Sequence, residues 1–509
     1  MTSKNFKAGP FSVLYENGFL RYIRYGESEI VRMIYFALRD EHWATLEVTI
    51  ANEQVTSNNN TFNIQYECSH QRDGVNVFVW KVSVHASADG EIVFEIEGKA
   101  LTDLLKNRAG FCILHPLRET AGSPCMLIHP DGHTSTGTFP EFIAPQNPFK
   151  NVKAMRWNVD GHAYRLDFEG DIFETEDQRN WSDSSFKTFC TPLENPVPVL
   201  LRRGDKVHQR VTFRPEAALS EGFNSSPIRS LTTAEPHNLP TIGIAASTET
   251  DVLAPEAIRL LKELKLSHYR IEVRPTDENW KDRLLTDTRN ASQLELPLEI
   301  ALHLTDNFEY EWNAFVNESA EKQMPIKTLI LLGKDRNVTD QAIIDRVPSI
   351  KAHMPSVLVG AGTDYNFAQL NQNRFKADVL DFVTFSIHPQ EHAFDDLSIM
   401  ETLESHADLV KSARHMYPGA AVHVSPVTLR KRYNPYAQAA DKRILSNEVR
   451  SDPRQLSDFA AAWTTQSIYA LSGGGAKSVT FYQTVSRQGI LSAKAEPYPV
   501  YFALKKILA

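Results

Sequence analysis

The sequence predicts two domains of different classes, an antiparallel β-sandwich followed by a (β/α)8 barrel. Up to about residue 230, short runs alternate apolar and polar residues with a period of two, as strands with one buried face do. From residue 241 onward, strand-like runs alternate with helical runs, the pattern of a parallel barrel. A chain of 509 residues is also too long for a single hydrophobic core. We therefore predict a sandwich over residues 1–230, a linker over 231–240 and a barrel over 241–509.

The predicted sandwich rests on alternating runs that turn signals separate. The clearest runs are residues 19–25, 44–50, 75–84, 91–97 and 163–168, with an Asp-Gly turn at 89–90, 131–132 and 160–161. Residues 107–116 also resemble the strand that carries an arginine and a histidine into the sugar site of galactose-mutarotase-like supersandwiches. The resemblance implies that subtype of sandwich. His115 on this strand either faces a carbohydrate or is a satisfied structural histidine.

The predicted barrel rests on eight strand-like runs after a polar, proline-bounded linker. These runs are residues 241–247, 268–274, 297–304, 326–333, 357–360, 382–388, 421–425 and 478–485. Helical patterns lie between them, for example at 254–266, 398–415 and 456–471, and residues 499–508 form the closing helix.

Composition excludes several classes of partner. The net charge of −9 is spread along the chain without a basic run, so nucleic acid is not expected as a partner. No apolar run approaches the roughly 20 residues that span a bilayer, and residues 1–10 lack the apolar core of a signal peptide. We therefore expect a cytoplasmic protein. The four cysteines are scattered and are predicted to be free thiols.

The densest candidate site in the sequence is the segment 171–193. It gathers carboxylates and cations around Trp181 and three phenylalanines, and packed aromatic neighbours are what a site needs to hold charged groups still. The alternative is a structural network of ion pairs on a long loop. The charged and polar residues of interest are Glu176, Asp177, Arg179, Asn180, Asp183 and Lys187.

Strand alternation predicts a second set of candidates inside the barrel mouth. If the leucines and isoleucine of residues 298–304 face the helices, Glu299 and His303 face the interior. The same rule turns further polar residues inward, and active sites of this fold lie at the carboxyl ends of the strands. These inward residues are Arg270, Glu272, Arg274, Ser386, His388, His423, Ser425, Thr480 and Tyr482.

Two loops add polar groups at the same end. The run from His388 to His392 has the letters of an H-x-x-E-H zinc signature, but Pro389 breaks the helix that this signature requires, so no metal is expected. His388 and His392 then serve either in hydrogen bonding and proton transfer or as structural residues, with Glu391 beside them. The loop after the fifth strand offers Asp364 and Asn366.

A retaining glycosidase on this type of barrel needs one carboxylate after strand four and another after strand seven. Residues 331–335 contain no Asn-Glu pair, and residues 421–437 contain no carboxylate. The pattern therefore counts strongly against a standard glycosidase. Two alternatives stay open: a glycoside hydrolase with non-standard catalytic residues, and a carbohydrate-binding protein without turnover.

Three segments, 176–187, 362–371 and 389–395, together resemble the D-apionate lactonase family of bacterial apiose catabolism. The resemblance implies hydrolysis of D-apionolactone to D-apionate by a cytoplasmic enzyme. Such an opening needs a positioned water, a base and donors for the oxyanion, without an obligatory metal or cofactor. We expect Glu176 or Asp177 as base, Arg179 and Lys187 as oxyanion partners, and His392 or His388 as proton carrier.

These roles require the segment 171–193 to lie over the barrel mouth, near His388, Glu391 and His392, and we predict this arrangement. The expected partner is a small sugar lactone. The residues expected to bind it are Asn180, Asp183, Lys187, Asp364, Asn366, Glu391, Arg274, His303 and Tyr482.

Overall fold

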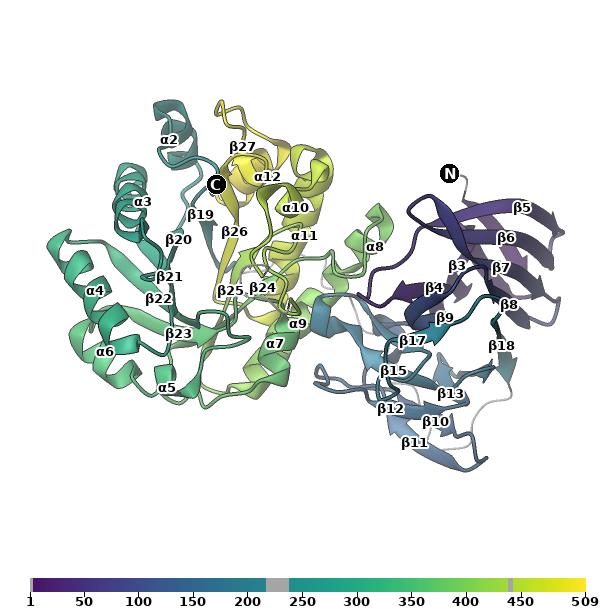
Figure 1. The fold of residues 1–509 in the computed structure, drawn as a ribbon. Helices are drawn as coiled ribbons and strands as arrows, with labels where there is room; N and C mark the ends of the chain where they lie inside the picture. The colour runs from purple at the N-terminus through teal and green to yellow at the C-terminus, as the bar shows by residue number, and fades with distance from the viewer. Residues whose placement is uncertain (1–2, 217–237, 438–442) are drawn as a thin grey trace. The chain divides into compact units, whose positions relative to one another are not determined.

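The computed structural model describes residues 3–216, 238–437 and 443–509, which form two compact units (Figure 1). The first unit holds Met1–Gln178 and Ser185–Leu231, and the second holds Thr232–Ala509 together with the short segment Arg179–Ser184. Of the predicted linker, residues 231–237 lie outside the described residues.

The first unit consists of two nine-stranded antiparallel sheets. One sheet has the order β1 (Lys4–Ala8), β2 (Phe11–Glu16), β3 (Phe19–Tyr25), β4 (Ser28–Asp40), β9 (Leu104–Pro116), β16 (Ser185–Phe189), β15 (Phe173–Asp177) and β12 (Phe149–Val152), with β17 (Val199–Leu201) paired to β9. The other has the order β11 (Thr134–Thr138), β10 (Pro124–Ile128), β13 (Ala154–Val159), β14 (His162–Glu169), β18 (Lys206–Glu216), β8 (Ile92–Ala100), β7 (Val75–Ala86), β6 (Phe62–Arg72) and β5 (Val48–Ser57). The short helix α1 (Leu117–Thr120) belongs to the same unit. Of η1 (Gln178–Trp181), only Gln178 belongs to it, and the other residues belong to the second unit.

Period-two alternation explains why these segments are strands with one buried face. Along β8, for example, every second side chain is buried, and these residues join one apolar core with residues from both sheets, such as Trp80 and Phe111. One predicted boundary is wrong. The run predicted at 44–50 does not begin as a strand, because the Asp40 carboxylate accepts hydrogen bonds from the backbone N–H groups of His42 and Ala44, which turns the chain before β5.

The second unit contains a closed parallel barrel (Figure 1). Its strands are β19 (Thr241–Ala245), β20 (Tyr269–Val273), β21 (Leu298–Leu304), β22 (Ile326–Gly333), β23 (Leu358–Gly362), β24 (Phe382–Ile387), β25 (Ala421–Val427) and β26 (Ser478–Val485). Pairing of β19 with β26 closes the barrel, and β27 (Gly489–Leu491) extends β26. The predicted fold class, antiparallel sheets followed by a (β/α)8 barrel, is confirmed.

Helices follow the strands as the sequence pattern predicts. They are α2 (Pro255–Lys262), α3 (Trp280–Leu294), α4 (Phe308–Glu321), α5 (Gln341–Ile344), α6 (Val347–His353), α7 (Phe367–Gln372), α8 (Asp396–Glu401), α9 (Leu403–Met416), α10 (Asn447–Arg450), η3 (Pro453–Leu456), α11 (Asp458–Gly474) and α12 (Pro499–Ile507). Among the described residues, no helix is both long and apolar enough to cross a membrane.

The barrel interior is apolar in one layer and polar in another. Ala301, Ile330, Leu332 and Phe382 pack together as a small core. Beside them Glu299, which is almost fully buried, accepts hydrogen bonds from the hydroxyls of Ser425 at 2.6 Å and Thr480 at 3.0 Å. The inward orientation predicted for Glu299, Ser425 and Thr480 is thus observed, because a buried carboxylate must be met by donors.

Candidate active site at the carboxyl end of the barrel

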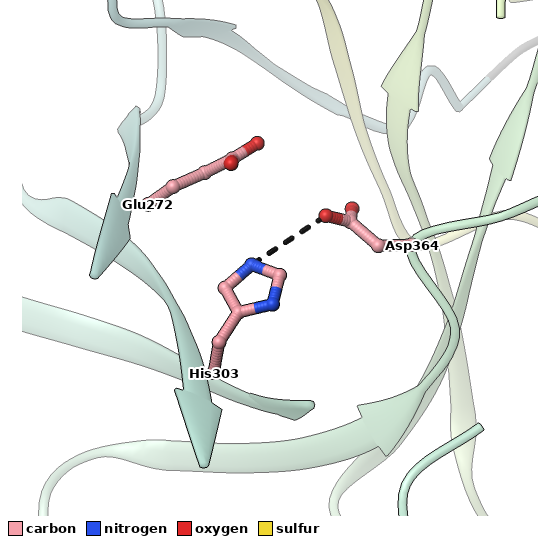
Figure 2. A group of neighbouring side chains, drawn as sticks. All are labelled: Glu272, His303 and Asp364. Carbon is pink, nitrogen blue, oxygen red and sulfur yellow. Dashed lines mark ion pairs between the residues drawn. The ribbon is translucent and has the colours of Figure 1, made fainter. Parts of the chain in front are cut away.

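Three acceptor side chains converge at the carboxyl ends of β20, β21 and β23 (Figure 2). Glu272 lies near the end of β20, His303 near the end of β21, and Asp364 two residues after β23. One ligand atom from each side chain lies within 4.8 Å of the other two. Parallel strands place their carboxyl ends on one rim, which is why residues so far apart in the sequence meet here.

Three arginines surround these acceptors. Arg270 donates to Glu272 at 3.0 Å and to Asp364 at 2.9 Å, and Arg274 donates to the other Glu272 oxygen at 2.8 Å. Arg432 contacts both carboxylates, Glu272 at 2.5 Å and Asp364 at 2.6 Å.

Tyr433 adds a hydroxyl to this frame, 2.9 Å from Glu272 and 2.6 Å from Arg274. Arg432 and Tyr433 come from the loop that follows β25. The loop after the seventh strand therefore supplies a cation and a hydroxyl where a retaining glycosidase would carry a carboxylate.

Burial and the arginines fix the charge state of the cluster. Burial alone would raise the pKa of Glu272, but the positive charges of Arg432, Arg274 and Arg270 outweigh it and hold that pKa well below its usual value. The pKa of Asp364 is also lowered, since Arg432 and Arg270 outweigh the effect of its burial. For His303, burial together with the charge of Arg274 lowers the pKa to about 3. At neutral pH the cluster is thus two carboxylates and one neutral imidazole.

The His303 ring and Asp364 face each other as two acceptors. Arg274 lies 3.2 Å from His303 Nε2 and can only donate, so this nitrogen carries a lone pair. Asp364 Oδ2, joined to the same nitrogen by the dashed line in Figure 2, is 3.6 Å away. Asp364 is 9% exposed, and Oδ2 is buried without a hydrogen-bond donor among the described residues. Arg274 already donates to the Nε2 lone pair, so Asp364 Oδ2 is the acceptor here that still calls for a proton donor.

The same three acceptors lie close enough together to hold a metal cation. The charges around them decide whether a cation or a neutral hydrogen-bond donor fits better. Glu272, Asp364 and Glu299, which lies 3.9 Å from Arg270, contribute three negative charges. Arg270, Arg274 and Arg432 contribute three positive charges in direct contact with these carboxylates. The carboxylates are already neutralised, so a divalent ion would add uncompensated positive charge. The group therefore fits a neutral donor, such as water or a sugar hydroxyl, better than a metal ion.

Two pockets of about 300 Å³ each open beside the cluster. His303, Asp364 and Tyr433 line the first, and Glu272, Arg432 and Arg450 line the second. Arg274 lines both, with its side chain 17% exposed. A small polyhydroxylated molecule in either pocket would reach the acceptor cluster.

The segment Arg179–Ser184 contributes a second group of predicted site residues to this unit. Arg179, fully buried, lies 2.7 Å from Asp408, and Asn180 accepts a hydrogen bond from Asn371 at 3.0 Å. Asp183 lies 2.7 Å from His392 Nδ1, and the Trp181 ring packs edge-on against the His392 ring. The Asp183 carboxylate therefore fixes the orientation of the His392 ring. Histidines that transfer protons are commonly oriented by a carboxylate in this way.

Glu176, Asp177 and Lys187 belong to the first unit. Glu176 pairs with Lys187 across neighbouring strands, and Asp177 accepts a hydrogen bond from the backbone of Ala144 at 3.1 Å. Their predicted approach to His388, Glu391 and His392 stays a prediction.

His388 and Glu391 lie in the loop after β24. The His388 ring is buried, its Nε2 is 3.9 Å from Glu391, and Glu391 is held by Lys431 at 3.1 Å. Burial lowers the pKa of His388 to about 4, against the opposing charge of Glu391. A small cavity at this point is lined by His388, Asn366 and Asp364, which connects the loop to the acceptor cluster.

The structure differs from the alternation rule at Tyr482. A register shift interrupts the pairing of β19 with β26, and Tyr482 adopts a φ of 47° there. The Tyr482 hydroxyl lies 2.8 Å from the Thr464 hydroxyl on α11, so the ring turns toward the helices. Gln483 takes the place beside the pocket and contacts Thr248. A bulge adds one residue, which reverses the faces that alternation predicts.

His115 on β9 is fully buried, with Nε2 2.8 Å from Thr188 and Nδ1 without a partner among the described residues.

The sequence predicted Arg274, His303 and Asp364 as site residues, and it placed Arg270 and Glu272 inside the barrel without assigning them to the site. It missed Arg432 and Tyr433. The available signal was the basic run from Arg430 to Arg432 directly after the seventh strand.

Comparisons with known proteins agree on one family. A family model described as "D-apionate lactonase, N-terminal domain" matches residues 1–218, and one described as "D-apionate lactonase, TIM barrel domain" matches residues 242–509. A curated protein named D-apionate lactonase, from Brucella anthropi, is 29% identical, with the match covering 96% of this chain and 84% of that protein.

Solved structures are more distant. A GH10 endoxylanase from a sugarcane soil metagenome matches 53% of this chain and 97% of its own at 11% identity and a TM-score of 0.33. A β-glucuronidase from Ruminococcus gnavus in complex with D-glucuronic acid matches 92% of this chain and 69% of its own at 8% identity and a TM-score of 0.36. These likenesses are too weak to support conclusions about function.

Proposed function

Because the chain belongs to the D-apionate lactonase family, we propose that it hydrolyses D-apionolactone to D-apionate at the carboxyl end of its barrel. The observation that carries the location is the buried Asp364 Oδ2, which has no hydrogen-bond donor among the described residues and faces His303 in a pocket large enough for a small sugar lactone. A hydrolytic water is a proton donor that would satisfy this oxygen.

The proposed reaction uses Asp364 as the base. Its carboxylate stays ionised at neutral pH and takes a proton from the water, while the water oxygen forms a bond with the lactone carbonyl carbon. Neutral His303, 3.6 Å from the Asp364 oxygen, accepts a hydrogen bond from Arg274 and so positions this arginine beside the same water. The carbonyl oxygen then carries a negative charge. The guanidinium of Arg274, which lines both pockets, stabilises this charge. When the ring C–O bond breaks, the proton on Asp364 passes to the ring oxygen, which leaves as a hydroxyl.

Two assignments of the base now compete, and single variants separate them. In a pH-stat assay with D-apionolactone, we expect Asp364→Asn and His303→Gln each to lower kcat by about 10² or more, since general-base contributions have that size. Asp335→Asn is the matched control. Asp335 lines the same pocket and has a φ of 59°, which asparagine tolerates, so this variant should stay within about threefold of wild type.

Full turnover by Asp364→Asn, with loss of turnover in Glu176→Gln or Asp177→Asn, would instead assign the base to the first unit. Aryl glycosides run beside the lactone test the glycosidase alternative. Exhaustive dialysis against EDTA should leave kcat unchanged; an activity lost there and restored by a divalent ion would contradict the metal-free reaction.

A further inference from the structure

The second pocket at the barrel mouth has no part in the proposed attack on the lactone. It opens among the carboxyl ends of β19, β20, β25 and β26, with a volume of about 300 Å³. Most residues that line it are polar, and two are large aromatic residues, Trp280 and Tyr482. Such a mixture suits a small hydroxylated ligand.

Arginines outnumber carboxylates among the residues that line this pocket. The lining has five arginines and three carboxylates: Arg270, Arg274, Arg283, Arg432 and Arg450, with Glu272, Asp277 and Asp287. Four of the arginines are paired: Arg270, Arg274 and Arg432 contact Glu272, and Arg283 contacts Asp287 at 2.8 Å. Asp364 and Asp251, outside the lining, add further partners for Arg270, Arg432 and Arg283.

Arg450 differs from these four. Among the described residues no carboxylate lies within ion-pair distance of its guanidinium, and its Nε is buried without a hydrogen-bond partner. Its nearest ring is Tyr433, whose centroid is 5.6 Å from the guanidinium carbon. Burial, reinforced by the positive charge of Arg432, lowers the pKa of Arg450, so the surroundings disfavour its charge. A guanidinium on a pocket wall, without an ion-pair partner and with one buried nitrogen that lacks a hydrogen bond, gains charge-assisted hydrogen bonds when an anion binds.

We propose that this pocket is an anion subsite in which Arg450, with Arg432 beside it, binds the carboxylate of a sugar acid. The proposal rests on the proposed function, because hydrolysis of a neutral lactone produces such an acid next to this wall. Glu272 and Asp277 line the same pocket and would repel a multiply charged ligand, which favours a monocarboxylate over a phosphate ester. The hydroxyls of Thr248 and Thr428 and the amide of Asn279 offer partners for the sugar hydroxyls.

Equilibrium binding tests the subsite without turnover. In titration calorimetry of the full chain with sodium D-apionate, we expect saturable binding, and at least about tenfold weaker binding of the neutral polyol made by reducing the acid. Arg450→Gln should weaken binding of the acid by about tenfold or more and leave binding of the polyol unchanged, because a charge-assisted hydrogen bond is lost. Arg450→Lys, which keeps the charge, should recover most of the affinity.

The matched control is Arg336→Gln, since Arg336 lines the other pocket. Unchanged affinity of Arg450→Gln for the acid, in protein whose thermal unfolding matches wild type, would overturn the subsite. So would a loss of acid binding in Arg336→Gln equal to that in Arg450→Gln. A chain that binds the acid through Arg450 but opens no lactone would retract the proposed function and keep the subsite, so the two failures are distinguishable.

Discussion

At the scale of single residues, the cluster works through the charge states that its arginines impose. A histidine with an ordinary pKa near 6.5 is mostly protonated at pH 5 and cannot accept a proton there. His303 has a pKa of about 3, and the pKa values of Glu272 and Asp364 are lowered as well. All three groups therefore remain in their unprotonated forms well below neutral pH.

This state predicts the pH dependence of lactone hydrolysis. Because the active forms are unprotonated and their pKa values are low, kcat/KM should fall only as pH approaches the folded-state pKa values, well below 6.5. We expect kcat/KM at pH 5 to stay within about twofold of its value at pH 7, whereas an essential base with a pKa of 6.5 would lower it about 25-fold. Initial rates corrected for spontaneous lactone opening measure this. A midpoint near pH 6.5 would assign the proton transfer to another histidine.

At the scale of elements, the segment Arg179–Ser184 is held by a buried ion pair. Arg179 is fully buried and its partner Asp408 on α9 has an 8% exposed side chain. Removing one member leaves the other charge buried, and such losses typically cost about 3–5 kcal/mol. We expect Asp408→Asn to lower the free energy of unfolding by an amount in this range, measured by urea denaturation.

An exposed pair provides the comparison for this loss. Arg336 and Asp306 pair at 3.2 Å with exposures of 51% and 90%, so Asp306→Asn should cost less than about 1 kcal/mol. If Asp408→Asn unfolds like wild type yet loses lactone turnover, Arg179 acts on the substrate, as the sequence-based prediction holds, and the ion pair is not its main role.

For single strands and loops, the sequence could predict side-chain orientation only where the alternation is regular. Regular alternation placed Glu299 and His303 correctly, because the barrel buries both faces of each strand and the period of two fixes the orientation. It failed at Tyr482, where one extra residue reverses the faces. Arg432 and Tyr433 were missed for another reason: they reach the cluster from a loop, and the position of a loop side chain depends on tertiary contacts that no periodicity encodes.

At the scale of the whole molecule, buried histidines make stability depend on pH. Seven of them have pKa values lowered mainly by burial: His115, His303 and His406 to about 3, His388 and His423 to about 4, and His70 and His268 in the same direction. Unfolded chains bind these protons near pH 6.5, so the unfolded state gains protons first as pH falls. Each histidine therefore removes up to about 1.4 kcal/mol of stability per pH unit between 6.5 and its folded-state pKa.

Two buried carboxyl groups act in the opposite direction. Burial raises the pKa of Glu119 to about 7 and that of Asp287 to about 6, so acidification favours the folded state through them. Seven histidines against two carboxyl groups leave a net loss of stability, and we expect Tm to fall between pH 6.5 and pH 5. In the His406→Gln variant the fall in Tm should be smaller, because glutamine does not titrate in this pH range. Its amide replaces the hydrogen bond that His406 makes with Ser467. A Tm that does not change over this range would contradict the depressed pKa values.

The segment Arg179–Ser184 belongs to the second unit but is synthesised before the rest of that unit. Arg179 leaves the ribosome 229 residues before Asp408, and at about 5–20 residues per second the wait is roughly 10–45 s. During this interval the first unit can fold around its own strands while a guanidinium destined for full burial remains in water. A nascent chain interrupted within the barrel would therefore expose this segment, and completion of synthesis through α9 is the step that removes it from solvent.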